Sequence, residues 1–97
     1  MTATDTSLIF ADGLTQKFAQ ESEFASKMFD AIGGKRYDKI VQRQTNGSSG
    51  SVHAFVERLT GQVYKAAGWS KPASGVRYAT VDDALQAADL YGSYLYR

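Results

Sequence analysis

The sequence contains no cysteine, so neither a disulfide bridge nor a thiolate metal site can form. It has one histidine, His53, and one proline, Pro72. Its apolar runs are only a few residues long, which excludes a membrane-spanning helix. The first ten residues, MTATDTSLIF, lack the basic and apolar regions of a secretory signal. We therefore expect a cytoplasmic protein that has no metal or cofactor and does not contact a membrane.

The composition is that of a folded chain. The 97 residues are 43% apolar and include six tyrosines, five phenylalanines and one tryptophan. This argues against disorder and is enough for one hydrophobic core. We find no internal repeat and no linker, so residues 1–97 are predicted to form a single domain.

The net charge of +1 hides a marked asymmetry along the chain. The acidic and basic residues sum to −3 over residues 1–34, to +6 over residues 35–81 and to −2 over residues 82–97. A basic middle of this kind can bind an anionic partner. The alternative is that acidic helices neutralise a basic sheet inside the same domain.

Residues 12–32 show helical periodicity. The apolar positions at helical spacing are Leu14, Phe18, Ala25, Phe29 and Ile32. Asp12 can cap the start of this helix, and Gly33-Gly34 is typical of a helix end. Residues 1–11 would then be an N-terminal arm or a short strand.

Three segments have the composition of strands, at residues 36–44, 51–59 and 62–69. In the second of them the alternation places Val52, Ala54 and Val56 on one face and His53, Phe55 and Glu57 on the other. Thr60-Gly61 predicts a hairpin between the second and third segments. A two-residue turn would pair Val56 with Lys65, and a turn with a bulge at Gly61 would pair Val56 with Tyr64. We prefer the second register because it buries Tyr64 and frees Lys65.

Residues 70–76 read as a loop, and a second helix follows Thr80. Thr80 and Asp83 form a capping box, and the apolar stripe beyond them contains Leu85, Ala88, Tyr91 and Leu95. The predicted fold is therefore α+β: a helix, a three-stranded antiparallel meander and a helix, packed as a two-layer sandwich.

Two features resemble catalytic motifs only superficially. The Gly/Ser stretch Gly47–Ser51 leads into a strand and lacks the lysine of a phosphate-binding loop, so we interpret it as a flexible hairpin loop rather than a backbone nest for an anion. His53 has neither a nucleophile nor an orienting acid at suitable spacing. We therefore expect no enzymatic activity, and we interpret Asp82 and Asp83 as helix-capping residues rather than an acid–base pair.

The basic, aromatic middle of the chain is the best functional candidate. Such residues bind phosphates through charge and bases through stacking. The order of elements is also that of the double-stranded RNA-binding domain, although the start of the second helix is acidic here, where that family has basic residues. The candidate partner-binding residues are Lys39, Arg43, His53, Phe55, Arg58, Lys65, Trp69, Lys71 and Arg77. Tyr91, Tyr94 and Tyr96 form a second candidate, a patch for contact with another protein.

Residues 51–78, SVHAFVERLTGQVYKAAGWSKPASGVRY, resemble small uncharacterised proteins encoded by tailed bacteriophages. The resemblance implies a phage protein acting in the host cytoplasm by binding a host or phage macromolecule. The predicted function is thus a non-enzymatic, phage-type binding protein that blocks or adapts a host complex. The alternative is a nucleic-acid-binding module that uses the basic, aromatic sheet of residues 35–81.

Overall fold

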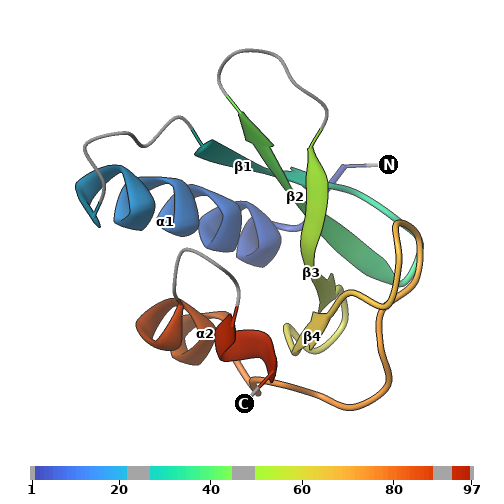
Figure 1. Ribbon diagram of the computed structural model, residues 1–97. Coiled ribbons are helices and arrows are strands. Elements are labelled where there is room, and N and C mark those ends of the chain that lie inside the picture. Colours follow the sequence, from blue (N-terminus) through green and yellow to red (C-terminus); the bar gives the residue numbers. More distant parts are fainter. Residues whose placement is uncertain (1, 22–26, 45–49, 89–92, 97) are drawn as a thin grey trace.

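The computed structural model describes residues 2–21, 27–44, 50–88 and 93–96 and has an α+β architecture. The chain runs through a helix, a four-stranded sheet, a second helix and a 3₁₀ turn (Figure 1). These elements are α1 (Asp5–Glu21), β1 (Lys27–Ile32), β2 (Tyr37–Gln44), β3 (Ser51–Glu57), β4 (Val63–Lys65), α2 (Val81–Ala87) and η1 (Ser93–Tyr96).

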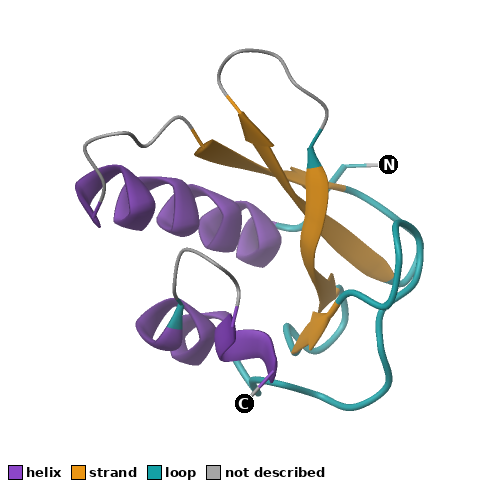
Figure 2. Ribbon diagram, in the orientation of Figure 1, coloured by secondary structure: helices purple, strands orange, loops and turns teal. Residues whose placement is uncertain are grey.

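The four strands form an antiparallel meander in the order β1-β2-β3-β4. The helices lie together on one side of the sheet (Figure 2). The long loop after β4 first passes over the other side, where Trp69 meets Lys39, and then returns along the β4 edge, where Tyr78 pairs with Val63. The core between helices and sheet contains Phe10 and Leu14 of α1, Ile40 of β2, Val56 of β3 and Tyr94 of η1. We call the side of the sheet that faces away from the helices the outer face.

The first helix begins earlier and ends earlier than predicted. Its buried positions are Ser7, Phe10, Ala11 and Leu14, which follow the spacing of one helical face. The N-terminal arm and the Asp12 cap were wrong, because residues 5–11 are helical and Asp12 lies within the helix. Thr4 is the cap: its hydroxyl oxygen accepts a hydrogen bond from the Ser7 N–H at 3.3 Å. Residues 22–26, including the predicted apolar position Ala25, lie outside the described residues.

Residues 27–32 form an edge strand, so the sheet has four strands rather than three. The exposed fractions of the side chains alternate with a period of two: Phe29 is 5% exposed, whereas Met28 and Ile32 are 41% and 40% exposed. Gly33-Gly34 is the turn into β2 and does not end a helix. Phe29 and Ile32 are three positions apart, which matches one face of a helix, whereas in the strand they lie on opposite faces. This spacing explains the misassignment.

The β3–β4 hairpin contains Thr60-Gly61, as predicted, but both predicted registers were wrong. Val56 pairs with Val63, and Phe55 pairs with Tyr64. The Glu57 N–H donates to the Gln62 carbonyl, so the connection is four residues long. Gly61 closes it at a positive φ of 77°. The longer loop moves Val63 onto the core face and Tyr64 onto the outer face.

A β-bulge changes the predicted faces of β3. Ile40 pairs with Ala54, but the next β2 residue, Val41, pairs with Val52, and His53 is the extra residue between them. His53 therefore faces the helices together with Ala54, and Val52 faces the outer side with Val41. The predicted alternation of Val52 and His53 was thus wrong, whereas it was correct for Ala54, Phe55 and Val56. The loop residues 45–49, which include most of the Gly/Ser stretch, lie outside the described residues.

The second helix starts where the capping box predicts. The Thr80 hydroxyl accepts the Asp83 N–H at 3.1 Å, and Val81 and Ala84 are buried. α2 is short and is followed by the 3₁₀ turn η1, in which Tyr94 and Leu95 are buried. Tyr91 and Gly92 lie outside the described residues. The Lys17 ammonium donates to the Leu85 carbonyl at 2.8 Å, which joins α1 to the C-terminal end of α2.

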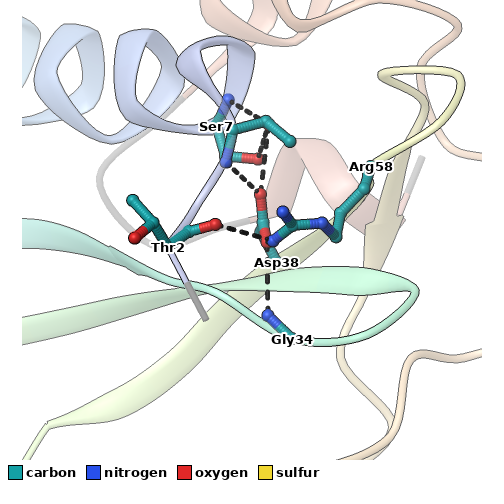
Figure 3. Close-up of polar contacts among 6 residues, drawn as sticks. Thr2, Ser7, Gly34, Asp38 and Arg58 are labelled. Atoms are coloured by element: carbon teal, nitrogen blue, oxygen red, sulfur yellow. Dashed lines mark hydrogen bonds and ion pairs between the residues drawn. The ribbon is translucent and has the colours of Figure 1, made fainter.

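The carboxylate of Asp38 connects the start of α1 to the sheet. Its side chain is fully buried and accepts hydrogen bonds from the Thr4 N–H at 2.8 Å and from the Arg58 guanidinium at 2.6 Å (Figure 3). The Gly34 N–H also donates to it at 3.4 Å, and Arg58 in addition donates to the Thr2 carbonyl. One side chain therefore holds the N-terminus, the β1–β2 turn and the β3–β4 hairpin together. We call this group the Asp38 node.

The Asp38 node fixes the turn that carries Lys35 and Arg36. A Cβ atom at Gly34 would collide with the Tyr37 carbonyl oxygen, so the turn needs glycine there. Burial by itself would raise the pKa of Asp38, but the hydrogen bonds from Thr4, Ser7 and Arg58 outweigh it and lower the pKa below its usual 3.8.

We predict that the Asp38 node makes the free energy of unfolding fall at low pH. A carboxyl group whose pKa is lower in the folded state stabilises the fold above its unfolded-state pKa, and this contribution is lost as the pH falls. The free energy of unfolding from urea titrations should therefore drop between about pH 5 and about pH 2. D38N should lose about 3 kcal/mol at neutral pH, because Arg58 loses a buried partner, and should show a shallower pH dependence.

The matched control is D30N, which removes a half-exposed carboxylate paired with Arg43. It should cost less than about 1 kcal/mol. Equal pH slopes for the wild type and D38N would show that Asp38 does not carry this dependence.

The turn at Gly61 gives a second prediction. G61A should destabilise the protein by about 1 to 2 kcal/mol, because alanine is strained at positive φ; the new Cβ would meet only Thr6 at an ordinary 3.6 Å. G68A is the control, since a Cβ at Gly68 has no atom within 4 Å. Its change should stay within about 0.5 kcal/mol in the same urea titrations. Equal stability of the two variants would contradict the turn conformation.

Candidate functional site

The outer face has a small apolar layer of its own. Val41 and Phe55 are 0% and 3% exposed, yet neither belongs to the core under the helices. The segment after β4 lies over part of this face: Trp69 lies against Lys39, and Ser70 and Pro72 line a hollow together with Phe55. The outer face is therefore partly covered, and the part beside Trp69 and the β1–β2 turn is accessible.

Other segments of the chain contact both edges of the sheet. At the β1 edge, the Phe29 N–H donates to the Thr15 hydroxyl of α1 at 2.9 Å. At the β4 edge, Val63 forms a bridge with Tyr78, and Ala66 forms one with Pro72. A partner that adds a strand needs unpaired edge groups. The arrangement therefore favours recognition through a face of the sheet rather than through an edge.

Aromatic rings on the outer face pack against one another. The Tyr37 ring meets the Phe55 and Tyr64 rings edge to face, with centroids 6.3 and 5.4 Å apart. Burial raises the pKa of Tyr64, and the nearby Glu57 carboxylate raises it further. Trp69 differs from these rings because it is 56% exposed, and the Lys39 ammonium lies 4.6 Å from its ring centroid.

A hollow of about 300 Å³ lies between the β1–β2 turn and the segment that contains Trp69. Its floor includes Tyr37 and Phe55, and its rim carries the cations of Lys35, Arg36 and Lys39. No carboxylate is among the described residues that line it. Ile32, which is 40% exposed, adds an apolar side to the rim. We call this feature the outer-face groove.

The ion pairs of the described residues leave most of these cations available. Arg36 pairs with Glu57 at 3.2 Å, and this hydrogen bond raises the Arg36 pKa. Arg43 pairs with Asp30 on a half-exposed surface, where such pairs are weak. The third pair joins Arg58 to Asp38. In the described part of the chain, no ion pair involves Lys35, Lys39 or Lys71.

The structure brings some of the predicted partner-binding residues together and separates others. Lys39, Arg43, Phe55 and Trp69 lie on the outer face, and Lys71 is exposed between Ser70 and Pro72. Arg58 belongs to the Asp38 node, and Arg77 is half-buried in the segment that pairs with β4. Lys65 follows Tyr64 in β4 and so points to the opposite side of the sheet.

His53 and Tyr94 belong to the interior rather than to a binding surface. The His53 ring meets the Phe29 ring edge to face, and its Nε2 lies 2.5 Å from the Tyr94 hydroxyl. Tyr94 is 1% exposed, so it cannot form a surface patch. Tyr91 and the side chain of Tyr96 lie outside what the structure describes.

The predicted partner-binding residues did not include Ile32, Lys35 or Arg36. Ile32 had been assigned to a helix, so its place beside the basic turn was hidden. The only available signal was the Gly-Gly-Lys-Arg run at residues 33–36, which is a tight turn with two adjacent cations.

Fold and surface together define a two-layer α+β domain with a basic groove on the outer face of its sheet. The chain belongs to DUF7717, a family of unknown function whose model matches residues 4–97. No curated protein and no solved structure matches the chain. In the described part of the chain, no group of three or more His, Cys, Asp or Glu residues is placed to hold a metal ion. No helix of that part is both long and apolar enough to cross a membrane.

The His53–Tyr94 contact gives a third prediction. Y94F should lower the free energy of unfolding by about 1 to 2 kcal/mol, because it leaves a partly buried His53 nitrogen without this partner. Y64F is the control, since the Tyr64 hydroxyl lies on the partly exposed outer face and donates a long, 3.5 Å hydrogen bond to the Gln62 side chain. It should change stability by less than about 0.5 kcal/mol. Urea titrations of both variants test this. A neutral Y94F would contradict the structural role assigned to His53.

Proposed function

We propose that this chain is a non-enzymatic binding protein whose outer-face groove holds an acidic segment of a partner protein. The observation that carries the proposal is the groove itself, whose rim carries Lys35, Lys39 and Arg36, the last paired with Glu57, and whose described lining residues include no carboxylate. A concave surface of one charge sign attracts and orients a partner of the opposite sign.

The apolar groups beside the groove supply the second part of the argument. Trp69 is 56% exposed and Ile32 is 40% exposed, and both border the cations. Tryptophan and arginine are the residues that most often carry binding energy at protein interfaces, usually in an apolar centre with a polar rim. Charge alone would give a weak, salt-sensitive contact, whereas this combination can give a specific one.

The burial and packing of the aromatic rings favour a protein partner over a nucleic-acid partner. Single-stranded nucleic acids stack successive bases on several exposed rings. Here Phe55 is 3% exposed, and the Tyr37 and Tyr64 rings pack edge to face. Trp69 beside Lys39 is the observation that supports the alternative, a nucleic-acid-binding module.

The resemblance of residues 51–78 to phage proteins gives the proposal a biological setting. In that setting the partner is a host or phage protein complex that this chain blocks or adapts in the cytoplasm. Both the phage origin and the identity of the complex stay predictions.

Binding of defined probes by isothermal titration calorimetry tests the proposal. The probes are a glutamate-rich peptide that contains leucine and a single-stranded oligothymidylate of the same net charge. We expect the peptide to bind the wild type and to bind K35Q/K71Q roughly tenfold more weakly, because one rim charge is lost together with the exposed charge of Lys71, which lies between the lining residues Ser70 and Pro72. Q16E/Q86E is the control, because it lowers the net charge by the same two units at exposed helix positions and should bind like the wild type.

Three results would go against the proposal. If only the oligothymidylate binds, the partner is a nucleic acid. If K35Q/K71Q and Q16E/Q86E lose affinity equally, net charge rather than the groove is responsible. If neither probe binds, the outer-face groove is not an acceptor for anionic partners.

A further inference from the structure

We propose that the chain also binds a second copy of itself, with the helix side of one copy against the outer-face groove of the next. The occupant of the groove is then an acidic surface that the same chain provides. The inference rests on the proposed function, because it uses the same groove as an acceptor of acidic groups. The surface that would occupy the groove is a separate one, on the helices.

That other surface lies on the helices and is acidic. The side of α1 that faces away from the core carries Asp5, Ile9 and Asp12, which are spaced at helical intervals and exposed. Asp82 and Asp83 are exposed in the first turn of α2. We call these five residues, together with Leu59, the acidic helix face.

The acidic helix face has an apolar centre and is hollowed. Ile9 is 58% exposed, and Leu59 at the β3–β4 hairpin is 93% exposed. Both line a hollow of about 400 Å³ that also contains Val81 and Asp82. A contiguous exposed apolar patch that is bordered by polar residues marks an interaction surface.

Few cations offset the charge of this face. Lys17 is the basic residue of α1, and its ammonium binds the Leu85 and Gln86 carbonyls of α2. Arg58 lines the hollow, but its guanidinium is paired with Asp38. The acidic helix face and the outer-face groove thus have opposite charges, and each has an apolar centre.

The acidic side chains lie on the helices, which cover one face of the sheet, whereas the groove lies on the other face. Leu59 lies at the border between them, because it lines a hollow together with Lys35 and Arg36. The carboxylates of one copy therefore do not fill its own groove. A stable contact buries roughly 800 Å² on each partner, about one-seventh of the 5675 Å² surface of this chain. One copy can therefore bind two neighbours at once. A contact between two different surfaces is heterologous, and it produces open chains or closed rings rather than a two-fold dimer.

Self-association would regulate the function proposed above. A second copy and an acidic partner use the same groove, so they compete for it. At high concentration most grooves would be occupied by a second copy of the chain. A partner that binds more tightly would displace that copy and dissociate the assemblies.

Sedimentation velocity of the purified chain tests the inference. Assemblies larger than a dimer should form in about 0.1 M salt and dissociate in about 1 M salt, where the Debye length falls from about 10 Å to about 3 Å. D12N/D82N removes charge from the acidic helix face, and K35Q/K71Q removes it from the groove. Each variant alone should associate roughly tenfold more weakly than the wild type.

Mixing the two variants gives the sharpest result. D12N/D82N keeps the groove and K35Q/K71Q keeps the acidic helix face, so the mixture should form a heterodimer that cannot grow. S51K/S74K is the control for D12N/D82N, because both raise the net charge from +1 to +3. Its two lysines lie at exposed positions outside the acidic helix face, and it should associate like the wild type. Circular dichroism spectra confirm that each variant is folded.

The outcomes separate this inference from the proposed function. If the wild type stays monomeric at low salt but binds the glutamate-rich peptide, the self-association is overturned and the proposed function stands. If the wild type associates but the peptide does not bind, the proposed function fails. A mixture that forms no heterodimer, or a two-fold dimer that survives in both variants, would also overturn the head-to-tail contact.

Discussion

The Asp38 node is the constraint on which the remaining structure depends. A buried carboxylate is costly unless charged and neutral donors surround it, and here those donors come from three distant parts of the chain. The cap of α1, the β1–β2 turn and the β3–β4 hairpin must therefore all be in place for the Asp38 carboxylate to have its hydrogen-bond donors. The groove cations Lys35 and Arg36 follow Gly34 directly. The buried carboxylate of Asp38 therefore positions these two solvent-exposed residues.

The sheet buries apolar groups on both sides, and this explains much of the chemistry of its surface. The helices cover one face, and the segment after β4 covers part of the other. The second covering is incomplete, and it leaves Trp69 and Ile32 exposed beside the cations. The groove thus lies where a second, smaller apolar layer is left uncovered. This is why its floor is aromatic, while its rim carries the cations of the neighbouring turn and strand.

Local signals in the sequence predicted the α+β class, three of the four strands, the capping of α2 by Thr80 and the hairpin at Thr60-Gly61. They did so because each depends on residues close together in the chain. The misassignment of residues 27–32 came from apolar residues that lie at helical spacing. The role of Asp38 could not be predicted, because its partners Thr4 and Arg58 are 34 and 20 residues away. His53 was placed on the wrong face because a β-bulge leaves no clear mark in sequence. The basic middle is a charge pattern of the sequence, but which of its cations share one surface depends on the register of β1 and β2.

The contact between Lys39 and Trp69 has a practical consequence. Trp69 is the one tryptophan in the chain, so the intrinsic fluorescence of the protein reports a single location. That location is half open to water and lies beside a cation at the rim of the groove. Any molecule that settles there changes both the polarity around the indole and its access to dissolved quenchers. The unlabelled protein therefore carries its own optical indicator of whether its outer face is covered.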